Sequence, residues 1–123
     1  VVRDAGADVV ADRDALPAPE SQDAVIDIAG GPGWAGRIDA LRPGGHLAVA
    51  GAIAGPLVTT DLRRLYLRDI TLHGCTWQPP AVFARLVAMM QSGQVRPLVA
   101  QTYPLHEIAR AQAAFLSKLH PGK

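Results

Sequence analysis

The fold is decided by residues 24–29, Ala24-Val25-Ile26-Asp27-Ile28-Ala29, an apolar and β-branched run bounded by Asp23 and by Gly30-Gly31. This composition predicts a β-strand, and its nearly continuous apolar side chains predict that both of its faces are buried. Two further apolar runs have the same form, residues 46–50 before Gly51 and residues 70–73 before Gly74. Such strands, separated by helices and long connections, indicate parallel βαβ units. The predicted fold class is therefore α/β, with an open parallel sheet and flanking helices.

Apolar residues at helical spacing predict helices between and after these strands. A short helix is expected from Trp34 to Leu41, ended by Pro43-Gly44-Gly45. Longer helices are expected at residues 80–91 and 105–119, and a partly helical basic segment at residues 60–67. Residues 9–11 are expected to form a short strand, and residues 95–100 another extended segment.

Length and composition indicate one packed domain and exclude several classes of function. The chain has 123 residues, of which 49% are hydrophobic and 19% charged, which is a globular composition. The net charge is +1 and the basic residues are scattered, so the chain lacks the basic stripe needed to bind a phosphate backbone. The longest apolar stretch, residues 47–58, is interrupted by glycine and proline and is shorter than the ~20 residues of a membrane span. We expect neither nucleic acid nor a membrane as a partner.

The single cysteine, Cys75, excludes an internal disulfide and any zinc site built from several thiolates. One cysteine fits a reducing compartment, so the expected location is cytoplasmic. Because the chain begins with Val1 and shows no signal peptide, we expect it to be a piece of a longer protein.

A glycine-rich motif, Gly31-Pro32-Gly33-Trp34-Ala35-Gly36, matches the dinucleotide fingerprint G-x-G-x-x-G between a strand and a helix. Three features count against a phosphate-binding role. Pro32 has no amide to offer, the helix is only about two turns long, and Ala50 stands where the fingerprint expects an acidic residue. The prediction is a glycine-rich turn, with a phosphate loop in a complete small protein as an alternative.

Other polar residues have two interpretations each. His73 and Cys75 could begin a metal site, but His46 is distant in sequence and no second cysteine exists, which favours an edge-strand histidine and a small buried cysteine. Asp27, inside an apolar strand, either accepts bonds from amides at the strand end or is functional, and the first is favoured. The arginines at 63, 64 and 68 form either an anion-binding patch or, as favoured here, a solvated helix face.

Seven short motifs follow one another along nearly the whole chain, namely Ala5-Gly6-Ala7-Asp8, Asp23-Ala24-Val25-Ile26-Asp27-Ile28-Ala29-Gly30-Gly31, Leu41-Arg42-Pro43-Gly44-Gly45, Val49-Ala50-Gly51, Thr71-Leu72-His73-Gly74, Tyr103-Pro104-Leu105 and His120-Pro121-Gly122-Lys123. In this order they resemble the C-terminal part of the nucleotide-binding domain of medium-chain dehydrogenases/reductases. Within that superfamily the chain is most similar to the group of zinc-type alcohol dehydrogenases and quinone oxidoreductases.

The resemblance implies that residues 1–123 are the C-terminal portion of a Rossmann-like domain. The first strands of that domain, its true pyrophosphate loop and the catalytic domain would all lie outside the chain. The parent would be an NAD(P)-dependent oxidoreductase that moves a hydride to or from a carbonyl, alcohol, quinone or enoyl substrate. The chain alone would be inactive, would carry no catalytic residue and would bind no zinc.

The resemblance also implies cofactor contacts for NAD or NADP. Ala29 and Gly30 would lie near the adenosine. Backbone groups and small side chains would line the nicotinamide, from Gly51, Ala52 and Ile53 after one strand and from Gly74, Cys75 and Thr76 after another. Lys123 takes a place where some relatives put a basic residue near the phosphates. A homodimer would form by pairing the edge strand at residues 70–74. A non-enzymatic α/β module that binds a partner through its exposed sheet edge is the alternative.

Overall fold

The computed structural model describes residues 2–12, 15–117, 119 and 122, and the chain falls into two compact units. The sheet unit comprises residues 7–77 and contains every strand found in the described residues. The helical unit joins residues 1–6 to residues 78–123.

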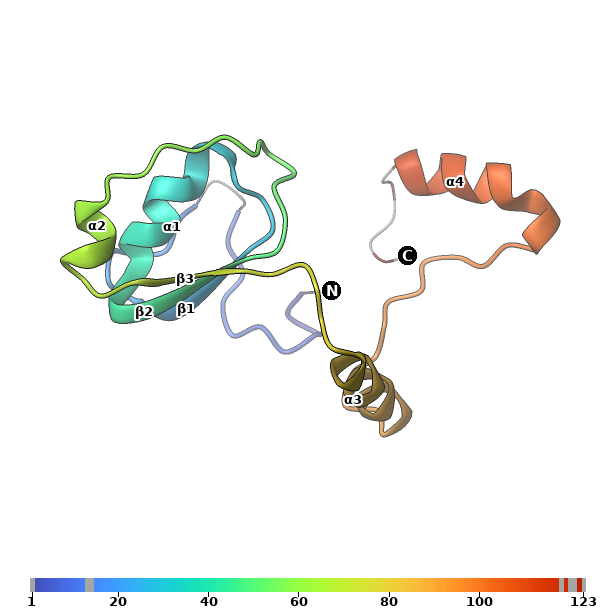
Figure 1. The fold of residues 1–123 in the computed structure, drawn as a ribbon. Helices are drawn as coiled ribbons and strands as arrows, with labels where there is room; N and C mark the ends of the chain where they lie inside the picture. Colours follow the sequence, from blue (N-terminus) through green and yellow to red (C-terminus); the bar gives the residue numbers. More distant parts are fainter. Residues whose placement is uncertain (1, 13–14, 118, 120–121, 123) are drawn as a thin grey trace. The chain divides into compact units, whose positions relative to one another are not determined.

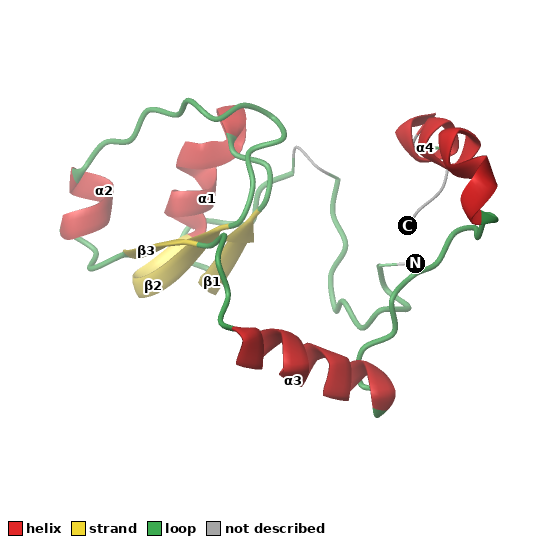
Figure 2. Ribbon diagram, turned by 45° about the vertical axis from the view of Figure 1, so that its right-hand side comes forward, coloured by secondary structure: helices red, strands yellow, loops and turns green. Residues whose placement is uncertain are grey.

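Three parallel strands form the sheet, β1 (Gln22–Asp27), β2 (Leu41–Val49) and β3 (Thr71–Gly74). Among the described residues they lie in the order β1-β2-β3, so β2 is central. The 3-10 turn η1 (Gly31–Gly33) and α1 (Trp34–Ala40) connect the first two strands, and α2 (Arg63–Tyr66) precedes the third. Both helices lie on the same side of the sheet in the two views of Figures 1 and 2. The predicted α/β class with an open parallel sheet is confirmed.

The core of the sheet unit lies between α1 and one face of the sheet. Trp34 and Ile38 of α1 pack with Leu41 and Leu47 of β2, and all four are buried. Partly buried apolar residues surround this cluster: Val25, Val49, Leu65 and Ile70. The apolar residues that recur along α1 therefore pack against the apolar run of β2.

The opposite face of the sheet is exposed, which corrects the prediction that residues 24–29 are buried on both faces. Ile26 is 79% exposed and Ile28 is 58% exposed. Because successive side chains of a strand point to opposite faces, Ile26 faces away from the side where Val25 packs. Both helices of the unit, α1 and α2, lie on the side of the sheet where Val25 packs (Figure 2). The composition of a strand shows that the strand is apolar, but it does not show which of its two faces another element covers.

Strand β2 begins at Leu41, five residues before the predicted start at His46. Gln22 pairs with Leu41 whereas Ala24 pairs with His46, so the register shifts within the strand. Gly44 has a φ of 77° and donates its amide to the carbonyl of Arg68 at 2.8 Å. Pro43-Gly44-Gly45 therefore forms a bulge in β2, and α1 has already ended at Ala40.

The helical unit contains α3 (Pro80–Gln91), the 3-10 turn η2 (Leu105–Glu107) and α4 (Ile108–Ser117). The prediction for residues 80–91 is confirmed. Of the helix predicted at residues 105–119, η2 and α4 form residues 105–117, and Leu119 is not helical. The prediction of a short strand at residues 9–11 is wrong, since within the described residues no strand pairs with this segment. The segment at residues 95–100 likewise pairs with no described strand. Among the described residues, no helix combines the length and hydropathy needed to span a membrane.

Candidate functional site

The candidate site lies at the carboxyl ends of β1 and β2, where two loops join through their backbones. The amide of Ala54 donates to the carbonyl of Ala29 at 2.8 Å, and the amide of Gly31 donates to the carbonyl of Gly55 at 3.0 Å. In open α/β sheets, ligands bind outside the carboxyl ends of the strands. The structure thus brings the predicted adenosine-side residue Ala29 next to the loop that follows Gly51, Ala52 and Ile53.

Glycine is required where these two loops touch. A Cβ on Gly30 would lie 2.6 Å from the carbonyl oxygen of Gly55, and one on Gly31 would lie 2.6 Å from that of Ala54. Both residues also have positive φ angles, 61° and 64°, which favour glycine. A Cβ on Gly51 would lie 2.8 Å from the carbonyl oxygen of Ile28. The glycines at these strand ends therefore allow one loop backbone to approach the other.

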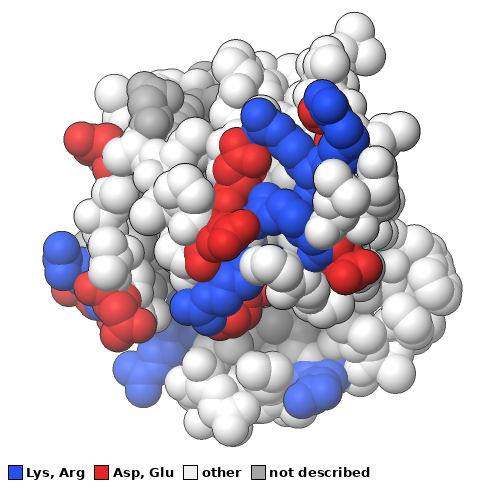
Figure 3. Space-filling view, turned by 90° about the vertical axis from the view of Figure 1, so that its left-hand side faces the viewer, with Lys and Arg blue, Asp and Glu red and all other residues white. Residues whose placement is uncertain are grey.

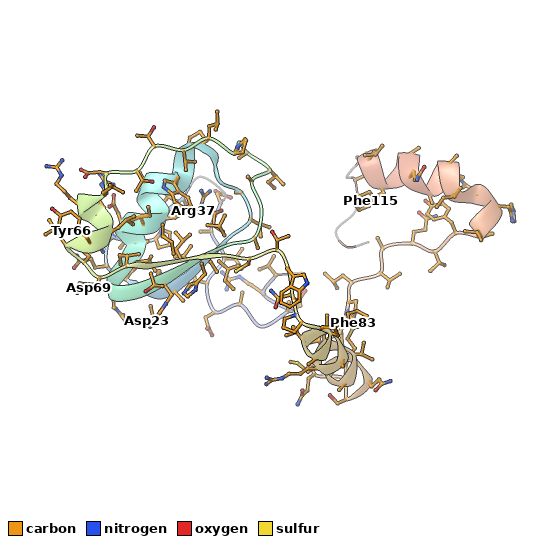
Figure 4. The ribbon with its side chains drawn as sticks, in the orientation of Figure 1. Asp23, Arg37, Tyr66, Asp69, Phe83 and Phe115 are labelled. Carbon is orange, nitrogen blue, oxygen red and sulfur yellow. The ribbon has the colours of Figure 1, made fainter. Side chains whose placement is uncertain are left out.

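The side chain of Asp27 fixes the loop that follows β1. This side chain is buried, and Oδ1 accepts the amides of Ala29 at 2.8 Å and Gly30 at 3.1 Å. The guanidinium of Arg37, on α1, lies 3.4 Å from Oδ2 and donates to the carbonyl of Gly30 at 2.8 Å. Figure 4 labels Arg37 on that helix. The prediction that Asp27 accepts bonds from strand-end amides is confirmed, whereas the arginine partner, ten residues away, was missed.

These bonds bear on the glycine-rich motif at residues 31–36. The amides of Gly30 and Gly31 already donate within the protein, and Pro32 has no amide. The helix that follows has seven residues. A phosphate loop needs several amides free to point at the ligand, so the geometry favours the predicted glycine-rich turn.

A pocket of about 370 Å³ opens beside the joined loops. This volume falls within the range of about 300–1,000 Å³ usual for small-molecule sites. Trp34 forms part of the lining, and its indole Nε1 donates to Oγ1 of Thr60 at 2.5 Å, which fixes the ring. The remaining lining residues come from both loops and from α1: Gly31, Pro32, Ala35, Ala54, Gly55, Leu57, Val58 and Thr59. At each loop the predicted site ended one residue before this lining, at Gly30 and at Ile53. Gly55 was the sequence signal that could have extended the prediction into the second loop.

The third predicted strand end follows β3. The amide of Cys75 donates to the carbonyl of Val49 at 2.9 Å, so Cys75 lies beside the end of β2, and with it the neighbouring Gly74 and Thr76. A Cβ on Gly74 would meet nothing within 4 Å. Because β2 lies between the two outer strands, Gly30 and Gly74 flank the loop at residues 51–53 from opposite sides. Lys123, the predicted phosphate contact, lies outside the described residues.

The arginines near α2 are bound to protein groups. Arg63 pairs with Asp61 at 2.8 Å and Arg64 pairs with Asp39 at 2.5 Å. The hydrogen bond to the Arg63 guanidinium, with a second to its amide, lowers the pKa of Asp61, and the same pairing raises the pKa of Arg63. Red and blue side chains alternate on the face shown in Figure 3. These contacts favour a charge-balanced surface over an anion-binding patch.

Arg68 has a structural role that sequence analysis did not predict. Its guanidinium donates to the carbonyl of Ile38 at 3.3 Å, to that of Asp39 at 3.4 Å and to that of Leu41. A cation at the carboxyl end of a helix satisfies carbonyls that lack intrahelical partners. Arg68 therefore caps α1. It lies beyond the end of α2 and its side chain is 18% exposed, so the solvated helix face predicted for the arginines at 63, 64 and 68 is wrong for Arg68.

His46 and His73, which are far apart in the sequence, are neighbours in the structure. Parallel pairing of β2 with β3 brings Nδ1 of His46 to 3.1 Å from Nε2 of His73. A catalytic zinc takes three protein ligands, and no group of three or more His, Cys, Asp or Glu side chains gathers among the described residues. The described part of the chain does not fit such a zinc centre.

Parallel strands joined by helices, with glycine-bearing loops at their carboxyl ends, define the Rossmann-like class of α/β folds. A family model described as zinc-binding dehydrogenase matches residues 4–123. The chain belongs to the zinc-binding dehydrogenase family. No curated protein matches the sequence significantly.

Solved structures agree with this assignment. An alcohol dehydrogenase candidate from Sinorhizobium meliloti 1021 is 45% identical with a TM-score of 0.73, over 81% of this chain and 28% of that chain. A thermostable alcohol dehydrogenase from Pyrobaculum aerophilum is 31% identical with a TM-score of 0.69, over 81% and 30%. Bacillus subtilis protein yhfP, solved with NAD bound, is 26% identical with a TM-score of 0.69, over 88% and 35%. The matched region is about a third or less of each of these proteins.

Proposed function

We propose that residues 1–123 form the C-terminal portion of the nucleotide-binding domain of an NAD(P)-dependent oxidoreductase. The observation that carries the proposal is the pair of loops joined at the carboxyl ends of β1 and β2, where glycine brings two backbones together beside a pocket. The family match supports it, as does a 25% identical reductase solved with NADP and 2-octenoyl-CoA. The parent enzyme would transfer a hydride to or from a carbonyl, alcohol, quinone or enoyl substrate, in the cytoplasm.

The proposed cofactor contacts follow the three strand ends. Ala29 and Gly30 lie on the adenosine side, and Gly51, Ala52, Ile53, Gly74, Cys75 and Thr76 surround the nicotinamide ring. Small residues and backbone groups suit this role, because the ring has to approach the backbone closely for its carboxamide to be bound. The cofactor supplies the hydride chemistry, and this chain's residues hold and orient it. The chain alone has no catalytic activity.

The test is a titration of the isotope-labelled 123-residue chain with reduced nicotinamide mononucleotide, NADH and NADPH, followed by amide NMR shifts. We expect weak, millimolar binding that shifts the amides of residues 51–53 and 74–76. Gly74→Val fills space that is empty in this chain, so it should abolish these shifts without unfolding the protein. Ala24→Val, on the exposed sheet face, is the matched control and should keep them.

Shifts confined to other residues, or a Gly74→Val variant that responds like the unsubstituted chain, would contradict the proposal. Micromolar binding that a Gly33→Val substitution abolishes would instead favour the phosphate-loop alternative at residues 31–36.

We further propose that the protein dimerises through β3, which lies at an edge of the described sheet with all four of its residues exposed. An open strand edge offers unpaired backbone groups, and a two-fold axis would pair it with its own copy. Sedimentation analysis should show a dimer that Leu72→Lys converts to a monomer. Ile26→Lys, on the other edge strand, should leave the dimer intact, and equal effects of both substitutions would exclude this interface.

A further inference from the structure

His46 and His73 lie side by side on the exposed face of the sheet, one on β2 and one on β3. Nδ1 of His46 is 3.1 Å from Nε2 of His73, and the stacked rings have centroids 5.3 Å apart. We propose that these two imidazoles bind a divalent transition-metal ion of the copper and nickel type. The proposal is independent of the nucleotide function, since neither histidine is among the proposed cofactor contacts.

The spacing of the two nitrogens suits chelation. With metal–nitrogen bonds of about 2.0–2.1 Å, nitrogens 3.1 Å apart subtend an angle of about 100° at the metal. That angle lies between the ~90° of square-planar coordination and the ~109° of tetrahedral coordination. The ring planes differ by 27°, and the broad torsion about the last side-chain bond of histidine lets both lone pairs turn toward one ion.

The neighbouring side chains on this face of the sheet add no positive charge. The register places Ala24, Ile26, Ala48 and Thr71 on the same face of the sheet as the two histidines. None of these four side chains carries a charge, so none repels a cation. Both histidines are exposed, and water would complete the coordination. Because imidazole is the only side-chain ligand, the site should select copper, nickel and zinc over magnesium and calcium.

Proton accounting also permits the site. In the present contact one ring nitrogen donates an N–H hydrogen bond to the lone pair of the other. Chelation by two neutral rings requires each to keep its proton on the nitrogen that faces away from the ion. One ring changes tautomer, no net proton is lost, and the metal replaces the shared proton between the rings.

The experiment is a titration of the tag-free 123-residue chain with copper sulfate, followed by calorimetry and by electron paramagnetic resonance of the bound Cu²⁺. We expect one ion per chain with a two-nitrogen hyperfine pattern. Separate His46→Gln and His73→Gln substitutions should each weaken binding at least tenfold and leave a one-nitrogen pattern. His106→Gln is the matched control, because His106 is an exposed histidine in the other unit and should have no effect.

A chelate and two independent imidazoles predict different stoichiometry. If the histidines act independently, each single substitution removes one weak site and leaves the other unchanged, which would overturn the proposal. An equal loss of affinity in His106→Gln would overturn it as well, as would a one-nitrogen spectrum for the unsubstituted chain. Far-UV circular dichroism of each variant identifies any loss that arises from unfolding, and the spectrum of the unsubstituted chain remains decisive in that case.

Discussion

Replacing Asp27 by alanine should destabilise the sheet unit far more than replacing Asp23 by alanine, although both residues belong to β1 and both pair with an arginine. Asp27 is 2% exposed, whereas the side chains of Asp23 and its partner Arg42 are 85% and 54% exposed. Removing Asp27 leaves the amides of the first loop without their acceptor and Arg37 without its counter-charge. The comparison therefore separates a buried network from a surface ion pair.

The expected magnitudes follow from these contacts. Removing one partner of a buried, hydrogen-bonded charge pair costs about 3–5 kcal/mol, so we expect that loss for Asp27→Ala. Asp27→Asn keeps a carbonyl acceptor for the two amides and loses only the charge, which should cost about 1–3 kcal/mol. Asp23→Ala breaks an exposed pair and should cost at most ~1 kcal/mol.

The assay is urea unfolding of each variant in a Trp77→Phe background. That background leaves Trp34, in the core of the sheet unit, as the sole tryptophan and fluorescence reporter. Urea midpoints are compared among variants that share the same slope of unfolding free energy against urea concentration, because that slope scales with the surface exposed on unfolding. Equal losses for the two alanine variants would refute the reasoning, as would an Asp27→Asn variant less destabilised than Asp23→Ala.

Three further predictions concern backbone contact, helix capping and pH. Gly51→Ala should cost about 1–3 kcal/mol because its Cβ would lie 2.8 Å from a carbonyl oxygen, whereas Gly74→Ala should be neutral in the same urea assay, and equal effects would contradict this. Arg68→Ala should cost about 1–3 kcal/mol of unfolding free energy through lost bonds to helix carbonyls, whereas Arg63→Ala, whose partner is an exposed carboxylate, should cost less than ~1 kcal/mol. The carboxyl of Asp61 should titrate below its usual pKa of about 3.9 in an NMR titration. Because its pKa is lower in the folded chain, the ion pair stabilises fully above the pKa of the unfolded chain, and this stabilisation is lost as the pH falls through the folded pKa. An Asp61 titration midpoint that stays the same in Arg63→Ala would contradict the assigned cause.

Strand positions were predictable because each strand has its own signal in a short stretch of sequence. The apolar runs that end at Gly30, Gly51 and Gly74 gave all three strands, and the parallel class followed from the helices between them. The early start of β2 was not predictable in this way. Proline and two glycines inside that strand read as a stop signal, and only the pairing with β1 turns them into a bulge.

Long-range contacts account for the rest of what was missed. His46 and His73 meet because of the register between β2 and β3, which sequence spacing does not give. The same holds for Arg68, whose targets lie about 30 residues earlier in the chain. At the candidate site, the strand ends were predicted, but the pocket wall at residues 54–59 depends on how the second loop folds back onto the first.

The cap that Arg68 provides bears on the order in which the sheet unit assembles. The carbonyls that it binds are aligned only once α1 has formed, so the segment leading into β3 gains this contact late. We therefore expect β1, α1 and β2 to form the folding nucleus, with β3 adding afterwards. Under that order, Arg68→Ala would speed unfolding and leave the folding rate nearly unchanged, whereas Ile38→Val in the buried cluster would slow folding. A slower folding rate in Arg68→Ala would place β3 in the nucleus instead.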